Sequence, residues 1–283
     1  MKRNKSKIKP LVYGVVAFFL SLVLFLLSIC TVLEMTVFSQ DYMLSVMGNN
    51  GYYEMVKSEM KTELKNLCNA SGLSNEFAEN FVDDYGIDTA VQDYIASFYS
   101  GDNTLVNTTV FKQKLYEAVD VYIKDNNIKT NEHTNEYIAN FVNEATEIYV
   151  NQISITFFST IANYIDKTKT PLLIITLSLA AAAVILIVLI VFTNRFKHRR
   201  FRYICYGLSG GFLSVTVLPT IVFLSGKIEK VNITTRSLYN LFTNYINGVL
   251  SSFYLISAVL LLAAVGVFVL YVRTYQKALK HTD

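Results

Sequence analysis

Hydrophobic residues in this sequence concentrate in four long runs, and apolar and polar residues are mixed in the segments between them. Each run has 24 to 36 consecutive residues without Lys, Arg, Asp or Glu. A helix rises about 1.5 Å per residue, so about 20 such residues cross a hydrocarbon core of about 30 Å. The pattern predicts four membrane spans, at residues 10–33, 170–193, 203–226 and 248–272.

The segment of residues 34–169 has apolar positions three or four apart, which indicates amphipathic helices rather than strands. We expect the first span to continue as helix to about Val46, and a long helix to cover residues 132–166. Other helices are expected to begin near Ser74, Asp88 and Thr108 or Thr109. The fold class is therefore all-α, a four-helix transmembrane bundle with a large helical extracytoplasmic domain between spans 1 and 2.

The short segment of residues 227–247 also has apolar positions at helical spacing. These are Leu238, Leu241, Phe242 and Tyr245. Because an apolar face must be covered by protein or lipid, we expect a helix nearly continuous with the fourth span that packs on residues 150–165. The alternative is an interfacial helix that lies flat on the bilayer.

Charge changes sign along the chain, although the net value is only +3. The amino-terminal residues 1–9, the turn 194–202 and the tail 273–283 have 13 basic residues and one acid, whereas residues 34–169 have 20 acids and 9 basic residues. Basic segments beside membrane spans stay in the cytoplasm. We therefore expect a multi-pass plasma-membrane protein with both termini cytoplasmic and the acidic segment outside.

The turn between the second and third spans reads "NRFKHRRFR". Clustered basic side chains attract polyanions of any kind. Nucleic-acid binding would need a larger basic surface, so we expect these residues to set the topology and to contact anionic lipid head groups. They are Arg195, Lys197, Arg199, Arg200 and Arg202.

Small residues line one side of the third span, where a neighbouring helix can approach closely. They are Gly207, Gly210, Gly211 and Ser214. The partners that we expect are residues 180–183 of the second span, all alanine, and Ala263, Ala264 and Gly266 of the fourth. The same small-residue face is also a candidate surface for a protein partner.

Catalytic chemistry has little support in residues 34–169, which contain one histidine, His133, and one cysteine, Cys68. A hydrolytic triad needs a base beside a nucleophile, and zinc needs four ligands. The "DDYGID" segment, with Asp83, Asp84 and Asp88, does not match a calcium loop and is better explained as a solvated helix end. We expect no enzyme activity, no metal and no cofactor, and the absence of ionisable residues within the predicted spans disfavours transport.

Residues 52–101 carry a loosely repeated pattern of aromatic, aliphatic and glycine positions. It consists of Tyr52, Tyr53, Gly72, Leu73, Tyr94, Ile95, Tyr99 and Gly101. This pattern is similar to uncharacterised four-span membrane proteins of low-GC Gram-positive bacteria. The resemblance covers the first span and the domain after it, and implies no activity.

The order of one span, a large outer domain and three further spans also resembles the cell-division type of ABC permease subunit, in layout only. Those subunits couple to an ATPase through cytoplasmic segments, and here the inner turn has nine residues. Our leading hypothesis is a non-enzymatic membrane protein whose acidic ectodomain senses, binds or assembles with an outside partner. The alternative is a permease-like mechanotransmitting subunit of an ATP-driven complex.

Overall fold

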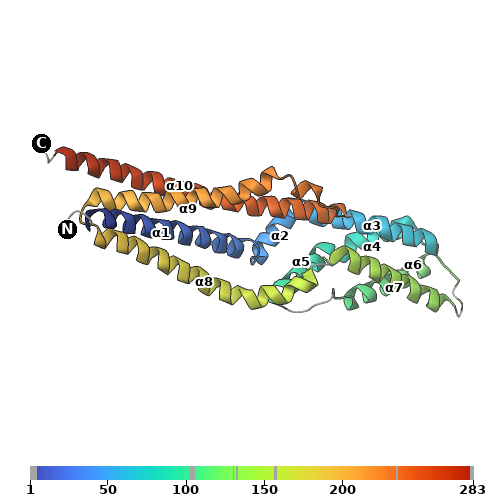
Figure 1. The fold of residues 1–283 in the computed structure, drawn as a ribbon. Helices are drawn as coiled ribbons and strands as arrows, with labels where there is room; N and C mark the ends of the chain where they lie inside the picture. Colours follow the sequence, from blue (N-terminus) through green and yellow to red (C-terminus); the bar gives the residue numbers. More distant parts are fainter. Residues whose placement is uncertain are drawn as a thin grey trace. The chain divides into compact units, whose positions relative to one another are not determined.

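The structure is a computed structural model that describes residues 5–101, 106–129, 131, 133–155, 158–233 and 235–280. In these residues it contains helices and no strand, which confirms the all-α class (Figure 1). The α-helices are α1 (Lys5–Met35), α2 (Gln40–Asn49), α3 (Tyr52–Ser71), α4 (Asn75–Tyr85), α5 (Ile87–Ser100), α6 (Thr109–Asp125), α7 (Thr134–Ile153), α8 (Phe158–Thr193), α9 (Lys197–Leu224) and α10 (Arg236–Lys280). A short 3-10 helix, η1 (Ile228–Lys230), precedes α10.

The chain divides into two compact units, each described by itself. The span unit contains the described residues up to Phe38, residues Lys169–Val231 and the described residues from Tyr245 onward. The helical domain contains the described residues of Ser39–Thr168 and of Asn232–Asn244. Residues 232–244 are distant in sequence from the rest of the helical domain but belong to it.

Four helices in the described part of the chain are long and apolar enough to cross a membrane, as expected of a multi-pass membrane protein. The candidate spans are Pro10–Met35, Lys167–Thr193, Lys197–Lys230 and Arg236–Leu279. Large apolar side chains point outward from them, for example Leu177 at 63% exposure and Leu262 at 72%. Such exposure suits helices whose outer faces meet hydrocarbon rather than water.

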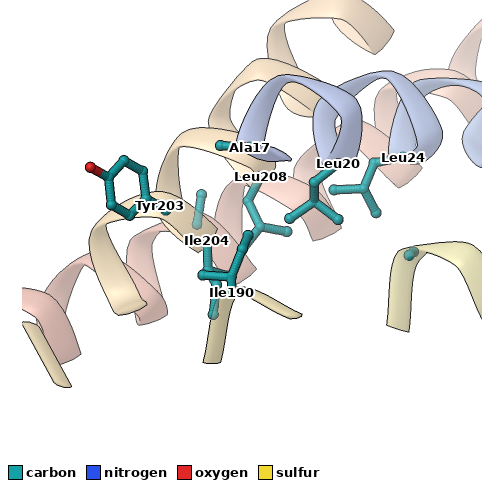
Figure 2. Close-up of a cluster of buried hydrophobic side chains, with 9 residues drawn as sticks. Ala17, Leu20, Leu24, Ile190, Tyr203, Ile204 and Leu208 are labelled. Atoms are coloured by element: carbon teal, nitrogen blue, oxygen red, sulfur yellow. The ribbon is translucent and has the colours of Figure 1, made fainter. Parts of the chain in front are cut away.

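The span unit has its own apolar core, to which all four candidate span helices contribute. Leu20 of α1 and Ile190 of α8 are fully buried in it. Figure 2 shows them beside Tyr203, Ile204 and Leu208 of α9. Farther along these helices, a hydrogen bond joins α9 to α10, because the hydroxyl oxygens of Thr216 and Ser257 are 2.6 Å apart.

The helical domain is built around α3, whose one face is buried along its length. This face consists of Tyr52, Val56, Met60, Leu64 and Cys68, which recur every four residues. α3 packs against α4, α5 and α7. An aromatic cluster fills the space between α4, α6 and α7, where the rings of Phe111 and Tyr149 stack with centroids 4.2 Å apart.

Helix boundaries differ from the expected ones at two places. α1 ends at Met35 rather than near Val46, because Ser39 starts a new helix by accepting a hydrogen bond from the N–H of Tyr42 at 3.2 Å. The helix expected over residues 132–166 is also wrong: α7 ends at Ile153, and the described residues from Phe158 onward belong to α8. Residues 132, 156 and 157 lie outside the described part.

The helix expected near Asp88 is α5, which begins at Ile87 with Gly86 in the capping position at φ 84°, so Asp88 lies inside its first turn. Glycine suits this left-handed geometry. The two other expected starts hold. Ser74 caps α4 by accepting from the N–H of Phe77, and Thr108 precedes α6, although Asn107 supplies the side-chain oxygen there.

The expected helix of residues 238–245 is part of α10, which runs unbroken into the fourth candidate span. Ser237 and Asn240, at the start of α10, form hydrogen bonds to α3, whereas the predicted packing on residues 150–165 involves side chains outside the described part and stays a prediction. Ser237 binds the carboxylate of Glu59, and Asn240 donates to the sulfur of Met55 at 3.1 Å. Apolar periodicity alone did not indicate the bond between Ser237 and Glu59, because both groups are polar.

Candidate functional site

An open groove of about 860 Å³ lies between α4 and α6 in the helical domain. Its size falls within the range of about 300 to 1,000 Å³ typical of ligand sites. The residues that line it come from α4 and its cap and from α6 between Lys114 and its C-terminal cap, Asn126. They are Ser74, Glu76, Phe77, Asn80, Phe81, Asp84 and Tyr85, with Lys114, Glu117, Ala118, Val121, Tyr122, Asp125 and Asn126.

Aromatic and aliphatic side chains form the floor of this groove. Phe77 and Phe81 are one turn apart on α4 and largely buried, at 9% and 8% exposure. Tyr122 of α6 meets Phe77 edge to face, with ring centroids 5.4 Å apart, and its hydroxyl accepts a hydrogen bond from the N–H of Ser74 at 3.2 Å. Val121 is 55% exposed. The contacts of Tyr122 with Phe77 and Ser74 therefore fix one end of the floor. Val121 adds exposed apolar surface beside it.

Carboxylates form the rim of the groove. Glu76 and Asp84 lie on α4, Glu117 and Asp125 lie on α6, and all four are exposed. Among the ion pairs of the described residues, none involves these four side chains. The lining contains one cation, Lys114, whose ammonium lies 5.1 Å from the centre of the Tyr85 ring. The groove thus has a formal charge of −3 over an aromatic floor.

Ion pairs hold α4 and the start of α5 against α3. Lys57, Lys61 and Lys65 lie one turn apart on α3, and they pair with Asp88 at 3.3 Å, with Asp83 at 2.7 Å and with Glu79 respectively. Lys65 beside it lowers the pKa of the Glu79 carboxyl from its ordinary value. Asp83 and Glu79 thus pair with α3, whereas Asp84 lines the groove.

The "DDYGID" segment includes the exposed end of α4, as expected of a solvated helix end, and it also carries two ion pairs. Asp83 and Asp88 bind lysines of α3, and only Asp84 faces the groove. No group of three His, Cys, Asp or Glu residues within the described part of the chain is placed to hold a metal ion. His133 is exposed, and Glu136 lies 3.9 Å from its Nδ1.

A second pocket, of about 370 Å³, adjoins the groove through Tyr85 and Lys114, which line both. Tyr94, Tyr149 and Asp93 contribute to its wall. The hydroxyl of Tyr85 donates to that of Tyr149 at 3.3 Å. Burial raises the pKa of both phenols, so they remain neutral hydrogen-bonding groups.

The small residues of the third candidate span meet α1, not the alanines of α8 and α10 that we expected. A Cβ built at Gly207 would lie 2.6 Å from Cδ2 of Leu20, and one at Gly210 would lie 2.5 Å from Oγ of Ser21. A Cβ built at Gly211 would lie 3.1 Å from Cβ of Leu24, which is a tight contact. Ser214 is exposed. Glycine therefore allows α1 and α9 to approach, because any larger side chain would collide with α1.

The basic run is mostly helical, because α8 ends at Thr193 and α9 begins at Lys197. Arg200 donates to the carbonyl oxygen of Asn194 at 2.7 Å, and Arg202 donates to the hydroxyl of Tyr203 at 2.9 Å. The other three, Arg195, Lys197 and Arg199, are exposed. The first turn of α9 contains no acid, so the charge of these side chains faces outward without an ion pair among the described residues.

Sequence analysis missed the groove, although its signals are visible in hindsight. Glu117 and Asp125 lie eight residues apart on α6, as do Glu76 and Asp84 on α4, and Val121 interrupts the polar face of α6. Spacing within one helix does not tell which helix lies beside it. The sequence therefore could not show that the carboxylates of α4 and those of α6 line the same groove. Comparison of the chain with protein-family models, curated proteins and solved structures finds no match.

Proposed function

We propose that this chain is a non-enzymatic multi-pass plasma-membrane protein whose helical domain lies outside the cell and binds a protein partner there. The observation that carries the proposal is the α4–α6 groove, an open surface with an apolar floor and four carboxylates free of ion pairs among the described residues. Apolar surface that water reaches often marks an interaction site. The ion pairs of α3 support it, because they join α4 to α3 through other acids, Asp83 and Glu79, and leave the carboxylates of the groove unpaired.

The proposed orientation rests on charge. The three cytoplasmic segments would contain 13 basic residues and one acid, whereas residues 34–169 carry a net charge of −11. Positive charge close to membrane spans is retained on the cytoplasmic side. Arg195, Lys197 and Arg199 would then lie at the cytoplasmic surface, where anionic lipid head groups complement them.

Binding is favoured over catalysis by the composition of the groove. Its lining contains neither histidine nor cysteine, and its carboxylates lie at an exposed rim rather than in a dry cleft. General acid and base groups usually need an environment that shifts their pKa toward the working pH. An exposed acidic rim over aromatic rings instead suits recognition of a surface.

Cross-linking from inside the groove tests the proposal. A photoreactive amino acid at Val121, in cells that make the protein natively, should give one adduct of defined mass. The same amino acid at Tyr116 is the control, because Tyr116 is 40% exposed on the same helix but does not line the groove. The adduct should disappear when Asp84 and Glu117 are replaced by Asn and Gln. Equal adducts at both positions, or none at Val121, would overturn the proposal.

A permease-like mechanotransmitting subunit is the second candidate, and one observation favours it. Glu59 of α3 holds Ser237 at the start of α10, the helix that continues as the fourth candidate span. Such a connection could transmit movement of the helical domain to that helix. Purification of the whole chain in mild detergent separates the two candidates, because a stoichiometric cytoplasmic ATPase would support the second and its absence the first.

A further inference from the structure

The two walls of the α4–α6 groove carry matching rows of charge. Glu76 and Asp84 are eight residues apart on α4, and Glu117 and Asp125 are eight apart on α6. Eight residues of helix cover about 12 Å at 1.5 Å per residue. The groove therefore has two carboxylates on each side, separated by about two helical turns.

Apolar groups lie between these rows. Phe77 and Phe81 are four apart on α4, whereas Ala118 and Val121 are three apart on α6. The lining of α6 extends from Lys114 to Asn126, about 18 Å at 1.5 Å per residue. This length matches about three turns of a docked helix, and amphipathic helices bind in grooves through apolar anchors three, four and seven residues apart.

We infer that the groove binds a basic amphipathic helix of a partner protein. Its apolar stripe would cover Val121 and the rings of Phe77 and Phe81, and lysine or arginine side chains about two turns apart on each flank would meet the four carboxylates. The inference rests on the proposed function, because it names the kind of partner that the groove would take. Charge complementarity fixes this choice, since an acidic helix would meet a surface of formal charge −3.

The position of Lys114 also indicates that the groove favours positive groups. Its ammonium lies over the ring of Tyr85, and no ion pair joins it to Glu117 or Asp84 among the described residues. The chain's own cation thus shows that an aromatic ring of the lining, that of Tyr85, can hold a positive group. A polyamine or a calcium ion would neutralise the rim but would leave Val121 uncovered.

Peptide binding to the whole protein in neutral detergent tests the inference. The probe is a fluorescent 15-residue peptide of leucine and lysine with its leucines on one helical face. The controls are a scrambled peptide of the same composition and an analogue with glutamate in place of lysine. We expect the amphipathic basic peptide to bind, both control peptides to bind at least about tenfold more weakly, and binding to weaken as salt is raised.

Matched variants locate the site. Glu117→Gln with Asp125→Asn should weaken binding about tenfold or more, whereas Glu144→Gln with Glu147→Gln removes the same charge from exposed positions of α7 and should leave it unchanged. An equal loss in both pairs, or equal binding of the scrambled peptide, would overturn the inference. An unchanged thermal unfolding midpoint of each variant shows that the fold is intact.

The two proposals can fail separately. If Val121 forms its groove-dependent adduct but the basic peptide does not bind, the helix assignment fails and the proposed function remains. If no groove-dependent adduct forms in cells, the proposed function fails, whatever the peptide does in detergent.

Discussion

The carboxylate of Glu59 accepts two hydrogen bonds from Ser237, one from the backbone N–H at 3.0 Å and one from the hydroxyl at 2.6 Å. Ser237 is the second residue of α10, where backbone N–H groups have no partner within the helix. A carboxylate there also interacts favourably with the positive end of the helix dipole. Glu59 therefore acts as an N-terminal cap supplied by another helix.

Replacing Glu59 should destabilise the helical domain. Glu59→Ala leaves the buried Ser237 without these bonds, so we expect a loss of about 1 to 3 kcal/mol in the free energy of unfolding. Glu63→Ala, at an exposed position of the same helix, should cost less than about 0.5 kcal/mol. Thermal unfolding of the whole protein in detergent measures both. Additive losses in the Glu59→Ala, Ser237→Ala double variant would contradict the pairing.

The ion pair of Lys65 and Glu79 predicts a pH dependence. Lys65 lowers the pKa of Glu79 in the folded state, so the pair's stabilising effect is complete above the ordinary carboxyl pKa of about 4.5 and is lost as the pH falls through the lowered value. Glu79→Gln should therefore lower the Tm at pH 7 but much less at the acid end. In a Lys65→Met background, the same substitution should have little effect at either pH. If the Tm difference between Glu79→Gln and the parent chain instead grew as the pH fell, the predicted direction of the pH dependence would be wrong.

Close contact of α1 and α9 makes Gly207 intolerant of a side chain. Gly207→Ala places a methyl group 2.6 Å from Leu20 and should destabilise the span unit by about 1 to 3 kcal/mol. Gly266→Ala in α10 is the control, because nothing lies within 4 Å of the added carbon, and the higher helix propensity of alanine makes it neutral or favourable. Thermal stability of the detergent-solubilised chain should separate the two, and similar midpoints would argue against the packing.

Cys68 should be chemically silent in the folded protein. It is fully buried on the core face of α3, and burial raises its thiol pKa to about 11. At pH 8 a thiol of that pKa is only about 0.1% thiolate, the reactive form. A maleimide should modify Cys68 only after denaturation, whereas Ser71→Cys, at an exposed position of the same helix, should react quickly. Equal rates in the native state would show that Cys68 is accessible.

Much of the fold follows from the sequence, because length without charge identifies the four long apolar helices and periodicity identifies most of the others. The cap at Ser74 is an example in which the local pattern was sufficient. The early end of α1 was missed because the apolar pattern continues past Ser39, and one capping hydroxyl decides the boundary.

Relations between helices were much less predictable. The contact of Gly207 with Leu20, the bonds of Ser237 to Glu59 and the groove between α4 and α6 each join residues that are distant in sequence. A glycine face shows that some helix can approach, and an apolar stripe shows that something covers it. Neither identifies the neighbour, which depends on the complementary shape and charge of all candidates together.

The side of the membrane on which the helical domain lies tests the account most directly. Ser100→Cys and Lys197→Cys place single thiols at exposed positions of α5 and of the basic run, and labelling is measured against the parent chain. With a membrane-impermeant maleimide on intact cells, the account predicts labelling at residue 100 and none at residue 197 until the membrane is permeabilised. Labelling at residue 197 but not at residue 100 in intact cells would contradict the proposed topology and with it the extracytoplasmic binding role.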